Sequence, residues 1–301
     1  MRKKRSGLNN ENRLGLFFML PSLVGFLAFT LIPVLLSVGI SFTSWDIISG
    51  IGNITWIGMD NYAQMLRDSY FIKSLQNNLY YTAVFVPATM ALALLLALGL
   101  KRRPYGQNAL KALFFIPYIT NIVVVSIIWM AMLQPYSGPV NKALSALGVA
   151  KPPMWLTKRV SAMPSIILVN VWFNVGYAMI IFLAGLQSIP GELYEAAEMD
   201  GAGPFRRFVN VTLPLLSPTT FFILVTTMIN SFKVFGTVNI MTQGGPSGDA
   251  TTVLVFHIYR SAFRYYKMGY ASAMSIVLFL MIFIVTMIQW QGQKKWVGYS
   301  L

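Results

Sequence analysis

Six long apolar runs constrain what this chain can fold into more than any other feature. They lie near residues 14–42, 78–100, 110–133, 164–187, 217–240 and 269–290. A helix crosses a bilayer core with about 20 mostly apolar residues, and a helix pairs its backbone polar groups within one segment. The chain is 56% hydrophobic and 11% charged, whereas soluble domains carry about 25% charged residues. The sequence therefore predicts an all-α integral membrane protein with six transmembrane helices, in a domain covering residues 14–290.

The basic residues indicate which side of the membrane the termini occupy. Six spans place both termini on one side, and cytoplasmic segments usually carry an excess of Lys and Arg. More than half of the 23 lysines and arginines fall in residues 1–13, 101–111, 188–216 and 291–301, on one side of the predicted spans. The bias is imperfect, because the loops at 134–163 and 241–268 are also basic. We predict cytoplasmic termini, with a basic tail at 1–13, a cytoplasmic loop at 188–216 and a second tail at 291–301.

The charge and the rare residue types exclude several classes of site. A net charge of +14 would suggest nucleic-acid binding in a soluble protein. Here most basic residues flank apolar runs, so membrane lipid is the expected partner, and no nucleic acid is expected. The chain has no cysteine and a single histidine, His257, which excludes thiolate and paired-histidine metal sites. We predict no metal site and no catalytic residue, and we interpret His257 as structural.

One short segment gathers much of the acidic charge. Of nine acidic residues, four lie close together, at Glu192, Glu195, Glu198 and Asp200. Gly201 can end a helix in a left-handed conformation, and Gly203-Pro204 can start another helix. The segment is thus a predicted helix–turn–helix, rich in small side chains that allow close approach. It is either a helix that docks in a groove of another protein or an ordinary solvated loop, and composition favours neither.

The spacing in this segment resembles a known signature. Glu195-Ala196-Ala197, Gly201, Val211 and Leu213-Pro214 match the EAA motif of binding-protein-dependent ABC importer permeases, EAA-x3-G-x9-I-x-LP, with Val211 in place of isoleucine. The stretches FLAGLQSIPGELYEAAEMDGA (182–202), GGPSGDATTVLVFHIYRSAF (244–263) and MGYASAMSIVLF (268–279) resemble the carbohydrate-uptake branch, which includes maltose- and glycerol-3-phosphate-type permeases. The resemblance runs from about residue 14 to 290.

The resemblance implies a fold, partners and site residues. The expected fold is that of a type I ABC importer permease (MetI-like) in a bacterial cytoplasmic membrane. The expected partners are a second homologous permease, in a heterodimer, two copies of a cytoplasmic ABC ATPase and an extracytoplasmic sugar-binding protein. ATP and Mg would be bound by the ATPase subunits and no cofactor by this chain, which lacks a GxxxxGK[ST] phosphate loop and is not expected to be an enzyme.

The resemblance also makes the 188–216 loop the site of ATPase coupling. Its expected coupling residues are Glu195, Ala196, Ala197, Asp200, Gly201, Arg206, Leu213 and Pro214. Glu195 would pair with a basic residue of the ATPase, and Ala196 and Ala197 would pack closely in its cleft. Gly201 would permit the turn.

Polar residues inside the predicted spans mark a candidate substrate path. Such residues usually face the bundle interior or a water-filled cavity. The candidates are Asn170, Phe173, Asn174 and Tyr177, then Thr227, Asn230 and Ser231, then Thr120 and Asn121. Amides and hydroxyls can pair with sugar hydroxyls, but these groups can also form hydrogen bonds that hold helices together. Lys233 is the one charged residue inside the fifth span, and its role stays open.

We predict a permease that moves a sugar by alternating access. A neutral di- or oligosaccharide is the first choice, because the path candidates include no Arg or His. Glycerol phosphate, a monosaccharide or a polyol remain alternatives. A secondary transporter ranks lower, because it would have no use for a coupling helix. A membrane enzyme also ranks lower, because this sequence shows no nucleophile–base constellation. The outer 241–250 stretch is either a contact for the binding protein or a plain reverse turn.

Overall fold

The computed structural model describes residues 5–101, 106–294 and 296–298. Within these residues the fold is helical, and the only β pairing is two isolated bridges. Five helices are long and apolar enough to cross a membrane: Leu14–Ile40, Ser69–Lys101, Arg159–Gln187, Ser217–Met241 and Met268–Gln293. A sixth crossing requires the bent pair Gln107–Ile119 and Ile122–Met132. Arg2, Lys3, Lys4, Arg102, Arg103 and Lys295, which support the predicted sidedness, lie outside the described residues.

The chain forms two compact units, and the first holds the N-terminal helix. It comprises the chain up to Arg67 together with Ile258–Val277. Helix α1 (Arg5–Phe26) continues through a π-helical turn (Leu27–Leu31) into α2 (Ile32–Ile40). Helix α1 starts inside residues 1–13, the predicted tail. No residue in the most apolar part of the Leu14–Ile40 span is buried.

A short helix and a loop complete the first unit. Helix α3 (Asp60–Arg67) carries Asn61, whose side-chain amide donates to the carbonyl oxygens of Ser41 and Thr43, at 2.8 Å each. These bonds tie the loop that follows α2 to the start of α3.

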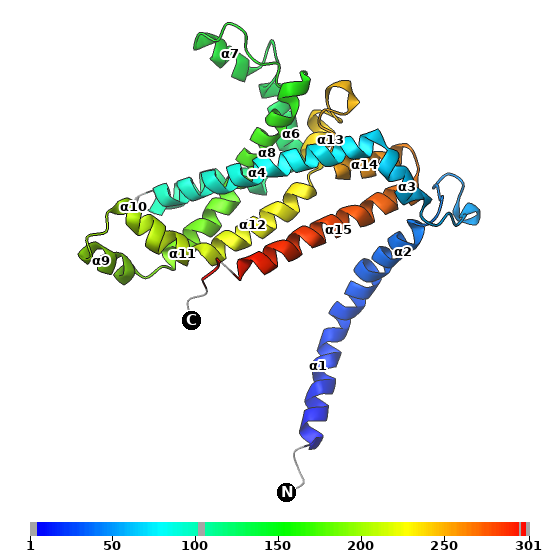
Figure 1. Ribbon diagram of the computed structural model, residues 1–301, viewed down its shortest axis with the longest axis horizontal. Coiled ribbons are helices and arrows are strands. Elements are labelled where there is room, and N and C mark those ends of the chain that lie inside the picture. Colours follow the sequence, from blue (N-terminus) through cyan, green and yellow to red (C-terminus); the bar gives the residue numbers. More distant parts are fainter. Residues whose placement is uncertain (1–4, 102–105, 295, 299–301) are drawn as a thin grey trace. The chain divides into compact units, whose positions relative to one another are not determined.

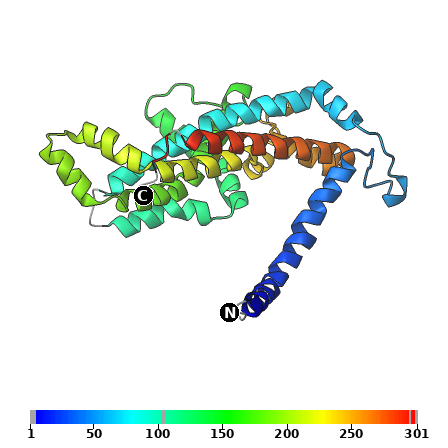
Figure 2. The same cartoon turned by 60° about the horizontal axis from the view of Figure 1, so that its bottom comes forward.

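The second unit holds the packed helices. It comprises Asp68–His257 and the chain from Leu278 onward. Its core is formed by α4 (Ser69–Lys101), α5 (Gln107–Ile119), α8 (Arg159–Gln187) and α12 (Ser217–Phe232). Ala93 and Ala97 of α4 are fully buried beside Met179 and Phe182 of α8. Helices α4, α8 and α12 run side by side (Figures 1 and 2).

The remaining helices are shorter, except the last. They are α6 (Ile122–Met132), α7 (Pro139–Ala146), α9 (Gly191–Met199), α10 (Pro204–Arg207), α11 (Leu213–Leu215), α13 (Gly236–Met241), α14 (Leu254–Tyr259) and α15 (Met268–Gln293). Short 3-10 turns lie at Ile51–Asn53 and Pro246–Gly248, and further π-helical turns at Phe208–Thr212 and Arg260–Arg264.

The third predicted span, near 110–133, is not one straight helix. Helices α5 and α6 meet at an angle of 98°. Pro117 lacks an N–H and crowds the preceding turn, and Thr120 is extended, with φ −77° and ψ 149°. Asn121 then caps α6, because its side chain accepts a hydrogen bond from the Val123 N–H at 2.8 Å. The apolar run is therefore two half-helices.

The fifth span also contains a break. Helix α12 ends at Phe232, and α13 begins at Gly236. Lys233, between them, is exposed and caps the C-terminus of α12, where a cation is favourable. This break lies against the break between α5 and α6, because a Cβ on Gly236 would lie 3.1 Å from Ile122 Cγ2 at the start of α6.

Helix α8 packs against α5 through a glycine, which gives a test of the packing. A Cβ on Gly176 would lie 1.8 Å from the Phe114 carbonyl oxygen. We expect Gly176→Ala to lower the free energy of unfolding by about 1–3 kcal/mol, because the helices must separate. Thermal unfolding in detergent measures this. The control is Gly99→Ala in α4, where a Cβ meets nothing within 4 Å; equal midpoints for both variants would contradict the packing.

Candidate functional site

Helix α9 presents the predicted coupling residues on an exposed surface. None of its residues is buried. Glu195 and Ala196 are exposed, and Ala197 is half-buried. Two large apolar side chains near them are largely exposed, Met199 at 89% and Phe205 at 77%. Exposed apolar side chains among charged ones are typical of a surface that another protein covers.

The turn after α9 confirms the conformation predicted for Gly201. Its φ is +73°, in the left-handed region. The Gly201 N–H donates to the Glu198 carbonyl at 2.9 Å, and the Ala202 N–H donates to the Ala197 carbonyl at 2.9 Å. This pair of bonds is a Schellman motif, which favours glycine at the left-handed position.

The return segment is tied back to α9 by two contacts. Arg207 of α10 forms an ion pair with Glu198 at 2.8 Å, and the Tyr194 hydroxyl hydrogen-bonds the Thr212 hydroxyl at 3.1 Å. Helices α9 and α10 thus form a hairpin. Four more predicted coupling residues are exposed, Asp200 and Arg206 on the hairpin and Leu213 and Pro214 in α11, which follows it. The hairpin is therefore preformed, with its predicted coupling residues directed largely to solvent.

A cavity of about 500 Å³ lies among the packed helices of the second unit. Its lining residues are Tyr81, Phe85, Tyr118, Ile122, Asn170, Phe173, Asn174, Asn230, Val234, Phe235, Gly236 and Thr237. Four of the predicted path residues are among them: Asn170, Phe173, Asn174 and Asn230. The cavity lies at the breaks between α5 and α6 and between α12 and α13.

The hydrogen bonds of two asparagines leave acceptors for a ligand. The Asn170 amide nitrogen donates to the Ile166 carbonyl and to the Thr237 hydroxyl, at 2.9 Å each. The Asn174 amide nitrogen donates to the Asn170 carbonyl at 2.8 Å. Neither side-chain oxygen is used in a hydrogen bond within the described residues. The bond from Asn170 to Thr237 joins α8 to α13, so Asn170 also holds two helices together, the alternative role that the sequence allowed.

The other predicted path residues do not line this cavity. Tyr177 stacks on Tyr118, a lining residue, with ring centres 4.6 Å apart. The Thr120 hydroxyl donates to the Ile116 carbonyl at 2.8 Å, and Asn121 caps α6, so both side chains are engaged at the break. Ser231 is buried and hydrogen-bonds Thr82 at 2.9 Å. Thr227 is half-buried.

The sequence reasoning missed the contribution of α4 and, apart from Phe173, the aromatic residues that line the cavity. Tyr81 and Phe85 stack with ring centres 5.0 Å apart. They stand four residues apart, on one helical face, and that spacing was the available signal. Aromatic rings and amide oxygens together form a surface that suits a polyhydroxylated ring with apolar faces.

Comparison with known proteins reveals extensive similarity. A family described as "Binding-protein-dependent transport system inner membrane component" matches residues 89–291. The probable ABC transporter permease protein YesP of Bacillus subtilis is 36% identical and is aligned over 100% of this chain and 96% of its own length. The sn-glycerol-3-phosphate transport system permease protein UgpA of Yersinia pestis is 34% identical over 81% of this chain and 82% of its own length.

A solved structure resembles nearly the whole chain. A subunit of a bacterial ABC transporter involved in the import of the acidic polysaccharide alginate superposes with a TM-score of 0.83. It is 25% identical, and the match covers 97% of this chain and 99% of that subunit. The same fold occurs in that transporter in complex with a pentasaccharide-bound periplasmic protein, with a TM-score of 0.84 and 24% identity.

Proposed function

Because this chain belongs to the family of binding-protein-dependent transport system inner membrane components, and so is a multi-pass ABC importer permease, we propose that it passes a neutral di- or oligosaccharide. The cavity of about 500 Å³ carries this proposal. Its lining combines aromatic rings with amides and the hydroxyls of Tyr81, Tyr118 and Thr237, and no charged side chain is among the lining residues. A neutral sugar would thus find hydrogen-bonding partners without an unpaired charge.

Anionic substrates are the alternative that the cavity favours less. UgpA is named for sn-glycerol 3-phosphate and the alginate importer for an acidic polysaccharide. An anionic substrate would need a cation, and Lys233 is the nearby one, adjacent in sequence to the lining residue Val234. The positive charge of Lys233 is already stabilised by the C-terminus of α12, so it does not require an anionic substrate.

The proposed assembly follows from the exposed hairpin and the family. In it, this permease pairs with a second permease, two copies of an ABC ATPase hold the ATP and Mg, and an extracytoplasmic binding protein delivers the sugar. The hairpin of α9 and α10 would be the ATPase contact. Its exposed Met199 and Phe205 support this assignment.

A short mechanical path would connect the hairpin to the cavity. Helix α8 carries Asn170 and Asn174, ends at Gln187, and is followed by α9 from Gly191. From Asn174 to the end of α8 is about 20 Å of continuous helix. A movement of α9 in an ATPase cleft would therefore shift the cavity lining through one rigid element. This is how ATP hydrolysis elsewhere would drive alternating access.

Purification and uptake test the proposal together. We expect the tagged chain to co-purify with a second permease and an ATPase, and the reconstituted complex to take up a neutral oligosaccharide only with ATP and its binding protein. Excess unlabelled glycerol phosphate should not compete. Strong competition by glycerol phosphate would indicate that the substrate is a phosphate ester and not a neutral sugar. ATP-independent uptake by the chain alone would contradict its role in an ATP-driven importer.

A further inference from the structure

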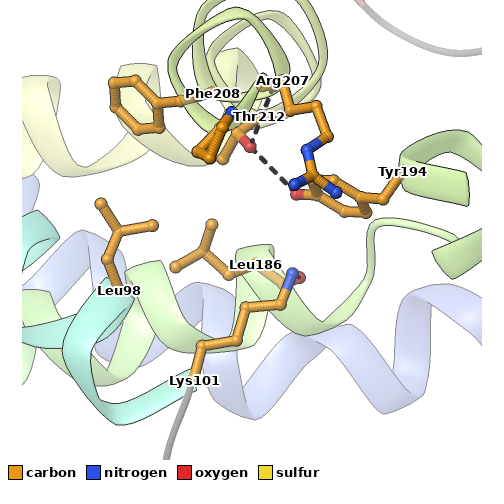
Figure 3. Close-up of a pocket in the computed structure, with 8 residues that line it drawn as sticks. Leu98, Lys101, Leu186, Tyr194, Arg207, Phe208 and Thr212 are labelled. Carbon is orange, nitrogen blue, oxygen red and sulfur yellow. Dashed lines mark hydrogen bonds between the residues drawn. The ribbon is translucent and has the colours of Figure 1, made fainter. Parts of the chain in front are cut away.

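A second cavity lies beneath the hairpin, and none of its lining residues also lines the sugar cavity. Its volume is about 380 Å³. Leu98 and Lys101 of α4 and Leu186 of α8 form one wall, and Tyr194, Arg207 and Thr212 form the other (Figure 3). All of these residues belong to the second unit. The importer mechanism proposed above uses none of their side chains.

The polar part of this cavity is cationic. Lys101 Nζ donates to the Leu186 carbonyl at 3.0 Å and lies 4.6 Å from the centre of the Tyr194 ring. An ammonium has three donors, so two remain. Arg207 has five N–H donors, and within the described part of the chain its one ion pair is with Glu198, whose side chain is 67% exposed. Two cations are therefore balanced by one carboxylate at the rim.

The remaining wall is apolar and lies at the ends of two spans. Leu98 and Leu186 stand within the last turns of α4 and α8, and Phe208 faces them across the cavity (Figure 3). Span ends lie near the lipid headgroups, and arginine and lysine there attract anionic lipid. The cavity thus has a cationic part and an apolar part, at the depth where a headgroup joins its acyl chains.

We propose that this cavity binds a phosphate group, namely the headgroup of an anionic phospholipid. Arg207 offers a planar fork that matches phosphate oxygens, and Lys101 offers a point charge. The Thr212 and Tyr194 hydroxyls lie at the same opening. The apolar wall favours a lipid over a free phosphate, because it would accommodate the chain next to the headgroup. The bound phosphate would join α4 to α10 and so hold the hairpin against the membrane end of the bundle.

The test uses the complete transporter in phosphatidylcholine nanodiscs that contain photoactivatable phosphatidylglycerol. We expect cross-links to peptides around residues 98–101 and 204–212. One basic residue near the surface contributes about 1 kcal/mol to anionic lipid binding. Lys101→Gln should therefore raise the half-saturating phosphatidylglycerol fraction about fivefold, while Lys101→Arg should stay close to wild type. The matched control is Lys111→Gln, a lysine of α5 that does not line the cavity.

The possible results separate the sources of phosphate. Loss of cross-linking in Lys101→Gln alone, with no displacement by inorganic phosphate or glycerol phosphate, supports a lipid site. Displacement by either soluble anion, again dependent on Lys101, supports a phosphate site with a soluble source. The same cross-linking in wild type, Lys101→Gln and Lys111→Gln overturns the proposal, and so does an equal loss in both glutamine variants, which would indicate only general surface charge.

Discussion

Gly201→Asp is expected to reduce ATP-driven uptake by about tenfold while the chain still inserts in the membrane. The Gly201 backbone is left-handed, at φ +73°, a conformation that costs most side chains about 1–2 kcal/mol and aspartate less. The expected tenfold loss, about 1.4 kcal/mol, therefore combines this strain with the effect of the new charge. The added carboxylate would also stand at the end of the exposed helix α9. Sugar uptake and ATPase activity of the reconstituted complex measure the effect.

A neighbouring glycine provides the matched control. Gly203 has φ −66° and, like Gly201, has open space where a Cβ would be added. Gly203→Ala should therefore transport normally, because alanine adopts that conformation without strain. Ordinary sugar-stimulated ATPase activity in the Gly201→Asp complex would show that this turn has no part in coupling.

Replacing Asn174 and Asn230 together with leucine is expected to lower uptake by roughly thirtyfold, or about fivefold for each lost hydrogen bond to substrate. Both side chains line the cavity of about 500 Å³. Asn174 uses its amide nitrogen within α8, so its oxygen would serve the sugar. The loss should appear in the KM for the loaded binding protein or in a changed substrate range.

A structural role for these asparagines makes a different prediction. Interhelical hydrogen bonds in membranes contribute about 0.6 kcal/mol on average, so the double variant would then lose thermal stability with unchanged sugar preference. Thr226→Val is the control, because among the residues that the structure describes the Thr226 hydroxyl donates only to carbonyls of its own helix. Unchanged uptake and substrate range in Asn174→Leu, Asn230→Leu would remove both residues from the path.

The third span has a bend that the sequence-based prediction of helices did not include. The run near 110–133 is long and apolar enough to cross, and its length predicts one helix. The structure bends it by 98° because Pro117 weakens the turn and Asn121 caps a new helix. The length of an apolar run indicates that the segment can enter a bilayer. It does not indicate whether the helix continues straight or bends. Pro117 and the polar pair Thr120-Asn121 were the visible signal.

The candidate path was predicted only in part, for a related reason. Helical spacing placed Asn170 and Asn174 on one face correctly, since that periodicity is local. It could not connect that face to Tyr81 and Phe85, which are about ninety residues earlier in the chain and reach the cavity only because α4 packs on α8.

Short-range features were determined by the sequence alone. The apolar runs specify membrane helices because a helix pairs its own backbone polar groups. The left-handed turn at Gly201 follows from the missing side chain, and the EAA spacing placed the chain in its family before any contact was known. Which polar groups meet was decided only by the tertiary structure. The close approach of Gly176 to Phe114 and of Gly236 to Ile122 sets helix distances that no local pattern encodes, because each depends on the shape of a partner helix elsewhere in the chain.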